Sequence, residues 1–433
     1  MSSPSEKILP SAARPAGGGR GLLLLAFIVT ALTLRSPLTA IAPIVNDLRA
    51  GLAIGSGTTG LLTSIPVLCF GVLTPLASLV IGRTSIETSV FMTLGGAAAG
   101  LVLRSSGGVG CALAGTLVLG ASLTIGNIVS LMIIARDFPD RSRIVTGLYT
   151  SALNVGTMLS SAMTAPLAQW AGWRIALAGV VLLVIPAIGL WVAVIRLPPA
   201  PSAPRGRMAG GRTADGPPEK RARGPAAVSH SPHSSHSLWR RPVAVLLMAA
   251  FAAHLTVYYS MTAWLPAYLM QATAMPSTTA GLVASLFQIL ALTGSFGVPA
   301  LAGRIALSRL LCAVAICWMV TPPGFLFAPE AWPAWCVTGG IASGGGFTAI
   351  FMLIMAHARD LRDNLRMSAL VQGGGYSLSS AGPLIIGGLH QASGGWTAGF
   401  LVLVVSAGTL LACGIGAGRI GVGPSLGAGA PEA

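Results

Sequence analysis

The residue of this chain that is best placed for chemistry is an arginine inside a long apolar stretch. Arg35 follows Gly21 by fourteen residues, which is about 21 Å along a helix. All eleven acidic residues lie outside the cores of the apolar stretches, so no carboxylate is expected at the depth of Arg35. Such a guanidinium can bind a small anionic or strongly dipolar molecule through paired hydrogen bonds. The alternative is a structural arginine that bonds helix carbonyls or extends to the nearer membrane face.

A second group of polar residues lies in the stretch FAAHLTVYYSMTAWLP. His254 and Tyr258 are four residues apart and therefore share one face of a helix. His254 could bind a substrate or carry a proton, because imidazole titrates near neutral pH; the alternative is a hydrogen-bonded packing residue. For other polar residues at depth, substrate contact and helix packing are both open; these are Asn127, Gln372 and Tyr376.

Two charged loops, RDFPDRSR (136–143) and RDLRDNLR (359–366), share arginine, aspartate, aspartate and arginine at their first, second, fifth and eighth positions. Each joins two apolar stretches on the same side of a membrane, and each mixes both signs of charge. Ion pairs between the loops could hold the two halves of the protein together and release them during a conformational change. The predicted gating residues are Arg136, Asp137, Arg359 and Asp360. The alternative is a pair of solvated loops that only fix the topology.

The sequence indicates neither an enzyme nor a cofactor-binding protein. No phosphate-binding loop is present, and no group of nucleophiles, bases or metal ligands gathers at one place, so no catalytic residue, cofactor or metal is predicted. The six cysteines lie in apolar stretches without a CxxC pair. His230, His233 and His236 are spaced three apart, but no cysteine or carboxylate accompanies them, and they are interpreted as part of a linker.

The elements that must position these residues are membrane-spanning helices. Hydrophobic residues make up 53% of the chain, charged residues only 9%, and the mean hydropathy is +0.78, whereas soluble domains carry roughly 25% charged residues. A helix needs about 20 apolar residues to cross a bilayer. We expect twelve such helices, near residues 21–45, 57–81, 87–104, 109–134, 144–168, 173–196, 242–270, 278–302, 306–327, 332–357, 366–389 and 396–418.

The chain repeats itself with an offset of 223 residues. Arg136-Asp137 returns as Arg359-Asp360, and Tyr258 occupies the position equivalent to Arg35. Parallel repeats of six helices are typical of one transporter architecture, in which the substrate site lies between the halves. The predicted organisation is a tail (1–20), a six-helix bundle (21–196), a disordered linker (197–240), a second six-helix bundle (241–418) and a tail (419–433).

The net charge of +15 reflects topology and not nucleic-acid binding. Of the 26 lysines and arginines, all but Arg35, Arg49, Arg104 and Arg174 fall in the tails, the linker and alternate loops. This bias follows the positive-inside rule. It predicts a multi-pass protein of the plasma (inner) membrane with both termini in the cytoplasm.

Across its whole length the chain resembles the major facilitator superfamily, and within it the cyanate and 2-nitroimidazole permease group. The matching stretches include LRSPLTAIAP (34–43), IGNIVSLMIIARDFPDR (125–141) and WLPAYL (264–269). The resemblance implies twelve helices in two pseudo-symmetric bundles, alternating access around a central cavity, and small compact solutes, among them anions such as cyanate. Members of the group usually carry asparagine where this chain has Thr33.

The predicted function is secondary active or facilitated transport of a small polar or anionic solute. Arg35 would hold the solute, and His254, Tyr258, Asn127, Gln372 and Tyr376 would complete the site. Coupling could use a proton carried by His254 or by the substrate, or could be absent. Beyond the solute and the bilayer, neither a nucleic acid nor an obligate protein partner is predicted. The alternative function is a drug or metabolite efflux transporter of the same fold.

Overall fold

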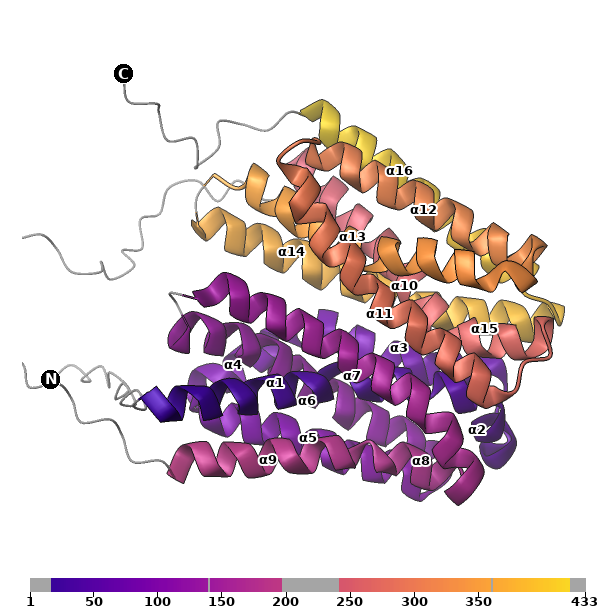
Figure 1. Ribbon diagram of the computed structural model, residues 1–433, viewed down its shortest axis with the longest axis horizontal. Coiled ribbons are helices and arrows are strands. Elements are labelled where there is room, and N and C mark those ends of the chain that lie inside the picture. Colours follow the sequence, from indigo (N-terminus) through magenta and orange to yellow (C-terminus); the bar gives the residue numbers. More distant parts are fainter. Residues whose placement is uncertain (1–16, 139–140, 197–240, 360, 421–433) are drawn as a thin grey trace, which may run out of the picture.

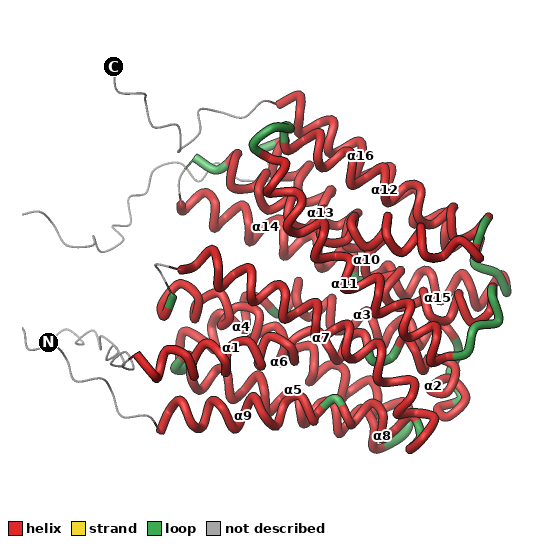
Figure 2. The backbone as a smooth tube through the Cα atoms, in the orientation of Figure 1, coloured by secondary structure: helices red, strands yellow, loops and turns green. Residues whose placement is uncertain are grey.

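The computed structural model describes residues 17–138, 141–196, 241–359 and 361–420 (Figure 1). Within these ranges every regular element is a helix (Figure 2). The predicted linker with its three histidines, and most of both predicted tails, lie outside the described residues. An all-helical membrane fold is therefore confirmed.

The helices fall into two groups, one from each half of the sequence (Figure 1). The N-terminal half contains α1 (Gly17–Thr39), η1 (Ala42–Ile44), α2 (Val45–Leu52), α3 (Ser56–Val72), α4 (Thr74–Arg83), α5 (Ile86–Ser106), α6 (Val109–Asp137), α7 (Ser142–Ala171), α8 (Trp173–Gly179) and α9 (Val181–Arg196). The C-terminal half contains α10 (Pro242–Ala272), α11 (Ser277–Ala302), α12 (Leu307–Phe327), η4 (Pro329–Ala331), α13 (Trp332–His357), α14 (Leu361–Ser379), α15 (Ala381–Ser393) and α16 (Thr397–Ile420).

Nine helical stretches of the described chain are long and apolar enough to cross a membrane, and the pair α3 and α4, bent by 60°, makes a tenth. Two further segments, α7 and the pair α14 and α15, bring the total to the expected twelve. Both carry more polar side chains because they face the other half: α7 packs on α11, and α14 packs on α3. The outward faces of the bundles expose large apolar side chains, including Leu76, Leu182 and Phe327, as a bilayer requires.

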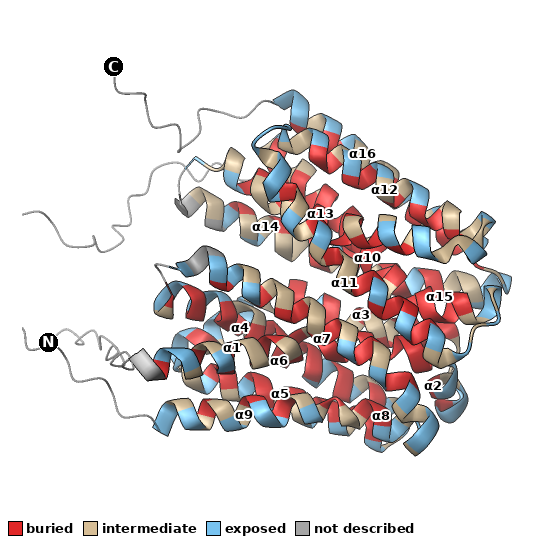
Figure 3. Cartoon of the chain, viewed as in Figure 1, coloured by how far each residue is buried: buried red, intermediate tan, exposed pale blue. Residues whose placement is uncertain are grey.

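The two halves meet along their inner helices (Figure 3). α1 begins and α16 ends on the same face of the molecule, which we call the termini face (Figure 1). Three hydrogen bonds cross between the halves in the described residues: Gly57 N to Gln391 Oε1, Gln169 Nε2 to Ser277 Oγ, and Ser161 Oγ to the Gly281 carbonyl. The first two lie at the opposite face, where α2 and the ends of α8 and α15 gather (Figure 1). The halves are therefore joined at the face opposite to the termini.

Glycines allow α11 and α13 to approach each other closely. A Cβ atom on Gly294 would collide with the Ile341 carbonyl of α13, and one on Gly344 would collide with the Ala291 carbonyl of α11. Backbone atoms cannot move aside as a flexible side chain can, so these two positions require glycine. Gly297, one turn further along α11, has no neighbour within 4 Å of such a Cβ.

We expect Gly294→Ala to lower the free energy of unfolding by about 1–3 kcal/mol, since overpacking forces the backbones apart. Gly297→Ala is the matched control on the same helix and should leave stability unchanged or slightly raise it, because alanine favours helix more than glycine does. Thermal unfolding of the purified protein in detergent measures both. Equal melting temperatures for the two variants would contradict the close approach of α11 and α13.

Candidate functional site

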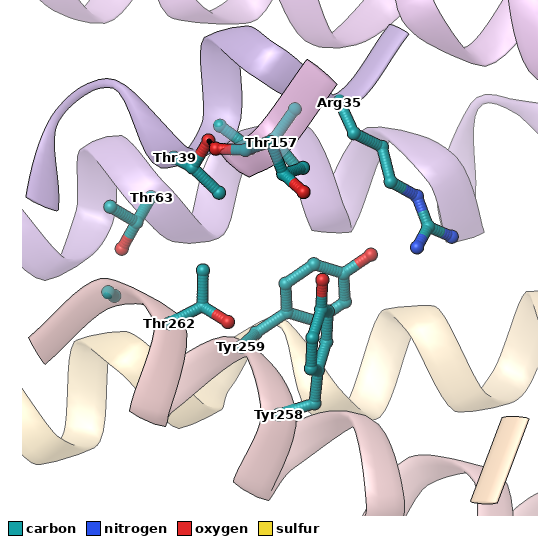
Figure 4. Close-up of a pocket in the computed structure, with 9 residues that line it drawn as sticks. Arg35, Thr39, Thr63, Thr157, Tyr258, Tyr259 and Thr262 are labelled. Carbon is teal, nitrogen blue, oxygen red and sulfur yellow. Dashed lines mark hydrogen bonds between the residues drawn. The ribbon is translucent and has the colours of Figure 1, made fainter. Parts of the chain in front are cut away.

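A small cavity lies between the two halves, midway along the helices (Figure 4). Its free volume is about 20 Å³, which is room for about one water molecule. The N-terminal half contributes lining residues from α1, α3 and α7, and the C-terminal half contributes them from α10. They are Arg35, Leu38, Thr39, Thr63, Thr157, Tyr258, Tyr259, Thr262 and Ala263.

Arg35 is positioned because α1 is held on two sides. Gly156 of α7 lies so close that a Cβ there would collide with the Leu32 carbonyl, one turn before Arg35. On another side, the indole of Trp191 on α9 donates a hydrogen bond of 2.8 Å to Thr30 Oγ1. Near Arg35, Thr33 and Ser36 bond carbonyls of their own helix. These hydroxyls therefore satisfy the helix backbone and leave the guanidinium for other contacts.

The Arg35 side chain extends from the N-terminal half toward the C-terminal half. Its Cζ atom lies 5.4 Å from the centre of the Phe347 ring on α13, a cation–π arrangement. The guanidinium also interacts electrostatically with four tyrosine hydroxyls, those of Tyr259, Tyr376, Tyr258 and Tyr149. Its Nε atom is buried and has no hydrogen-bond partner. No carboxylate of the described chain forms an ion pair with Arg35 under a 4 Å limit. Arg35 is thus a half-buried cation whose Nε atom is still able to donate a hydrogen bond.

Two adjacent tyrosines form the opposite wall of the cavity. Tyr258 donates a hydrogen bond of 3.2 Å to Gln288 Oε1, and the amide of Gln288 in turn donates to Thr262 Oγ1 at 3.1 Å. Tyr259 is equally buried, but its hydroxyl has no partner. Figure 4 shows both rings rising from α10 toward the N-terminal half, with the Tyr259 hydroxyl directed toward the Arg35 guanidinium.

The structure separates His254 from Tyr258, although both are on α10. His254 is 1% exposed and lies inside the C-terminal bundle, where Trp318 of α12 donates a hydrogen bond of 3.1 Å to its Nδ1 atom. Gly346 of α13 is packed against the imidazole ring. His254 therefore holds α10 to α12 and α13 in this structure, and it is not among the residues that line the cavity.

The other predicted polar residues lie around the cavity rather than on its wall. Asn127 of α6 accepts a hydrogen bond of 3.4 Å from Tyr149, one of the hydroxyls near Arg35. Tyr376 of α14 lies beside the Arg35 guanidinium and packs edge-on against Phe70 of α3, across the boundary between the halves. Gln372, one turn earlier on α14, is half-buried.

The predicted gating loops make ion pairs within their own halves in the described residues. Arg136 pairs with Asp137 and with Glu87, both at 2.9 Å. In the C-terminal half Asp363 pairs with Arg241 at 2.7 Å and accepts a hydrogen bond from the Arg359 amide. Burial opposes the ionised carboxylate of Asp363, but this hydrogen bond and the Arg241 charge lower its pKa. Asp360 lies outside the described residues.

Several residues of the site were not predicted from the sequence, notably Tyr259, Tyr149 and the cavity threonines. The threonines carried no signal, because threonine is common in membrane helices. Tyrosine did carry a signal, because it is scarce: the chain has only five tyrosines, and four of them lie near Arg35. Such a scarce residue type, distributed over α7, α10 and α14, is a sign of a shared site.

Two helical bundles with a small cavity between them, lined by residues of both halves, have the architecture of a membrane transporter. A family model described as "Major Facilitator Superfamily" matches residues 23–364. The chain belongs to this superfamily and is a multi-pass membrane transporter of small solutes. The family-level resemblance and the predicted fold are thereby confirmed.

Two bacterial transporters are similar in sequence to this protein over most of its length. A 2-nitroimidazole transporter of Escherichia coli (strain K12) is 28% identical over 407 residues, covering 93% of this chain and 97% of the relative. The cyanate transport protein CynX of the same organism is 26% identical over 378 residues, covering 86% and 91%. Among solved structures, an inward-facing, occupied bacterial homologue of the human lysosomal transporter Spinster superposes with a TM-score of 0.66 at 14% identity, covering 93% of this chain and 98% of that one.

Proposed function

We propose that this protein moves a small polar or anionic solute across the membrane by alternating access, and that the solute binds at Arg35. The observation that carries the proposal is the guanidinium itself. It is permanently charged, lies at the boundary between the halves, retains an unpartnered Nε atom and lines the central cavity. A cation at membrane depth without a carboxylate is costly, and a bound anion would offset that cost.

The proposed solute class is compact and planar, of the cyanate or nitroimidazole kind. Two relatives are named for such solutes. Because the cavity has room for only about one water molecule in this structure, a compact solute requires less separation of the halves than a large flexible molecule does. The aromatic rings near the guanidinium favour a flat anion or a polar heterocycle. A drug or metabolite exporter of the same fold is the alternative, since the relatives share only about a quarter of their residues with this chain.

The proposed orientation places the termini face in the cytoplasm. The support is the excess of lysine and arginine in the tails, the linker and the loops on that side. Under this orientation the hydrogen bonds at the opposite face lie at the extracytoplasmic entrance.

Coupling to protons is a separate part of the proposal. His254 was the residue expected to carry a proton, and its Nδ1 atom accepts a hydrogen bond from Trp318 inside the C-terminal bundle. This position supports a packing role and favours either coupling through a protonated substrate or facilitated transport without coupling.

Flux measurements test the proposal directly. Proteoliposomes containing the purified protein should accumulate labelled cyanate or 2-nitroimidazole above the level of protein-free vesicles, and excess unlabelled solute should compete. Imposing a pH gradient then distinguishes the coupling alternatives: an unaltered flux of cyanate excludes a coupled proton. If neither solute moves, while other compounds are exported from cells that carry the protein, the efflux alternative is favoured.

The loops at the termini face remain a proposed latch. We expect reversing one charge, in Asp137→Arg, to slow transport several-fold, because a latch between Asp137 and the 359–366 loop would be broken when the termini face closes. Combining it with Arg359→Asp should recover part of the rate. Uptake at unchanged protein abundance is the measurement, and a single variant with the rate of the unmodified protein would favour solvated loops without a gating role.

A further inference from the structure

The hydroxyl group of Tyr259 is a buried polar group that lacks a partner in the described chain. The residue is 6% exposed, and its hydroxyl makes no hydrogen bond. Buried polar groups are almost always bonded, so an orphaned one calls for an explanation such as an absent ligand. Because Tyr259 lines the cavity and its hydroxyl is directed toward Arg35, a ligand in the cavity would meet both (Figure 4).

The adjacent Tyr258 shows that tyrosine hydroxyls on the α10 side of the cavity do not generally lack a hydrogen-bond partner. Tyr258 is 7% exposed, and its hydroxyl is already bonded to Gln288. Gln288 is fixed by Thr262, so the Tyr258 hydroxyl is committed within the C-terminal half. The Tyr259 hydroxyl, by contrast, is directed toward the Arg35 guanidinium (Figure 4). The two neighbours on α10 therefore have different roles.

We propose that Tyr259 donates a hydrogen bond to the transported solute while Arg35 holds the same solute from the other half. This inference rests on the proposed function and extends it to the specificity of the site. The ligand must then be a compact anion or dipolar molecule that has two separate acceptor atoms, one for Arg35 Nε and one for the Tyr259 hydroxyl. A cation is repelled by Arg35, and a solute with a single acceptor leaves one of the two buried groups unsatisfied.

The bridge also links binding to the movement of the halves. Arg35 belongs to α1 and Tyr259 to α10, so a solute that contacts both stabilises arrangements in which the two helices lie close together around it. A ligand shifts a conformational equilibrium only through such differential contacts. A solute that reaches Arg35 alone should bind without promoting closure and should therefore be transported poorly.

The two tyrosines supply a matched test. We expect Tyr259→Phe to weaken binding of cyanate about 10- to 100-fold, as the loss of one hydrogen bond to a charged acceptor predicts. Melting temperatures of the unliganded variant should be unchanged or higher than those of the unmodified protein, because an unsatisfied hydroxyl has been removed. Tyr258→Phe should instead lower the melting temperature, since Gln288 loses its donor. The affinity control is Tyr268→Phe on the same helix: the Tyr268 hydroxyl donates to the Phe325 carbonyl and does not line the cavity, so the affinity should stay within about threefold of that of the unmodified protein. Binding is measured by titration of the detergent-solubilised protein with sodium cyanate, and then with nitrite and formate.

Each outcome decides one of the two proposals. If the unmodified protein binds a probe and Tyr259→Phe binds it equally well, the bridge is refuted while the transport proposal stands. If the unmodified protein binds none of the probes, the proposed solute class is wrong. The melting temperatures then test the contact between Tyr259 and the solute. A lower melting temperature for Tyr259→Phe than for Tyr258→Phe would show that the Tyr259 hydroxyl already has a partner within the protein, which refutes the bridge. Weaker binding together with unchanged stability supports the bridge.

Discussion

Replacing Arg35 with methionine is expected to reduce solute binding by at least about 100-fold and to bring transport to the level of protein-free vesicles. Methionine keeps the length and much of the apolar surface of the side chain but removes the charge and the donors. Each hydrogen bond from a charged group contributes about 1.5–3 kcal/mol, and a bidentate contact loses two of them. Arg35→Lys should recover only part of the activity, because an ammonium group lacks the planar fork of a guanidinium.

Arg104 is the matched control for this experiment. It is a fully buried arginine of the same half, 2% exposed, and its NH1 donates to the Pro37 carbonyl at 3.1 Å. It does not line the cavity. Arg104→Met should therefore lower the stability of the protein and the amount that folds, while the affinity of the folded fraction stays near that of the unmodified protein. A folded Arg35→Met variant that transports at the original rate would exclude Arg35 as the binding residue.

Tying the halves together at the face opposite to the termini is expected to stop transport completely and reversibly. A Cβ atom on Gly55 would lie 2.7 Å from the Cδ atom of Gln391, in the other half. The two positions are therefore separated by about the length of a glutamine side chain, a gap that a short, reducible bis-thiol linker between two introduced cysteines can span. Because alternating access requires this face to open, the cross-linked double variant should be inactive, and cleavage of the linker by a reducing agent should restore its transport.

The cross-linking experiment requires a background without reactive thiols. The six native cysteines, Cys69, Cys111, Cys312, Cys317, Cys336 and Cys413, are free in the structure and should first be replaced. Gly108→Cys combined with Gln391→Cys is the control pair, since nothing lies within 4 Å of a Cβ at Gly108. Continued transport by a fully cross-linked Gly55→Cys/Gln391→Cys protein would show that the halves need not separate at this face.

The sequence alone was sufficient for the fold because the determining signals are local. Runs of apolar residues long enough to cross a bilayer predict helices regardless of their neighbours, and a duplicated set of them predicts two bundles. The breaks within spans were harder to predict. The bend of 60° between α3 and α4, and the break at Val180 between α8 and α9, depend on local backbone geometry that hydropathy does not record.

Arg35 could be selected from the sequence because a charge at membrane depth is rare and costly. The structure places it at the cavity, and its role in binding stays a prediction. His254 met the same criterion of rarity, yet it lies inside the C-terminal bundle. A helix presents several faces, and the spacing of four between His254 and Tyr258 could not specify which of them points to the cavity and which to Trp318.

The sequence by itself therefore determined the number of spans, the duplication and the arginine whose position at membrane depth is energetically unfavourable. Only the tertiary structure decided which residues lie around Arg35. Tyr149, Tyr259 and Tyr376 are far apart along the chain, and their convergence on Arg35 depends on how α7, α10 and α14 pack and rotate about their axes. That rotation is set by side-chain and glycine contacts between helices, which are long-range in sequence and cannot be obtained from the periodicity of a single segment.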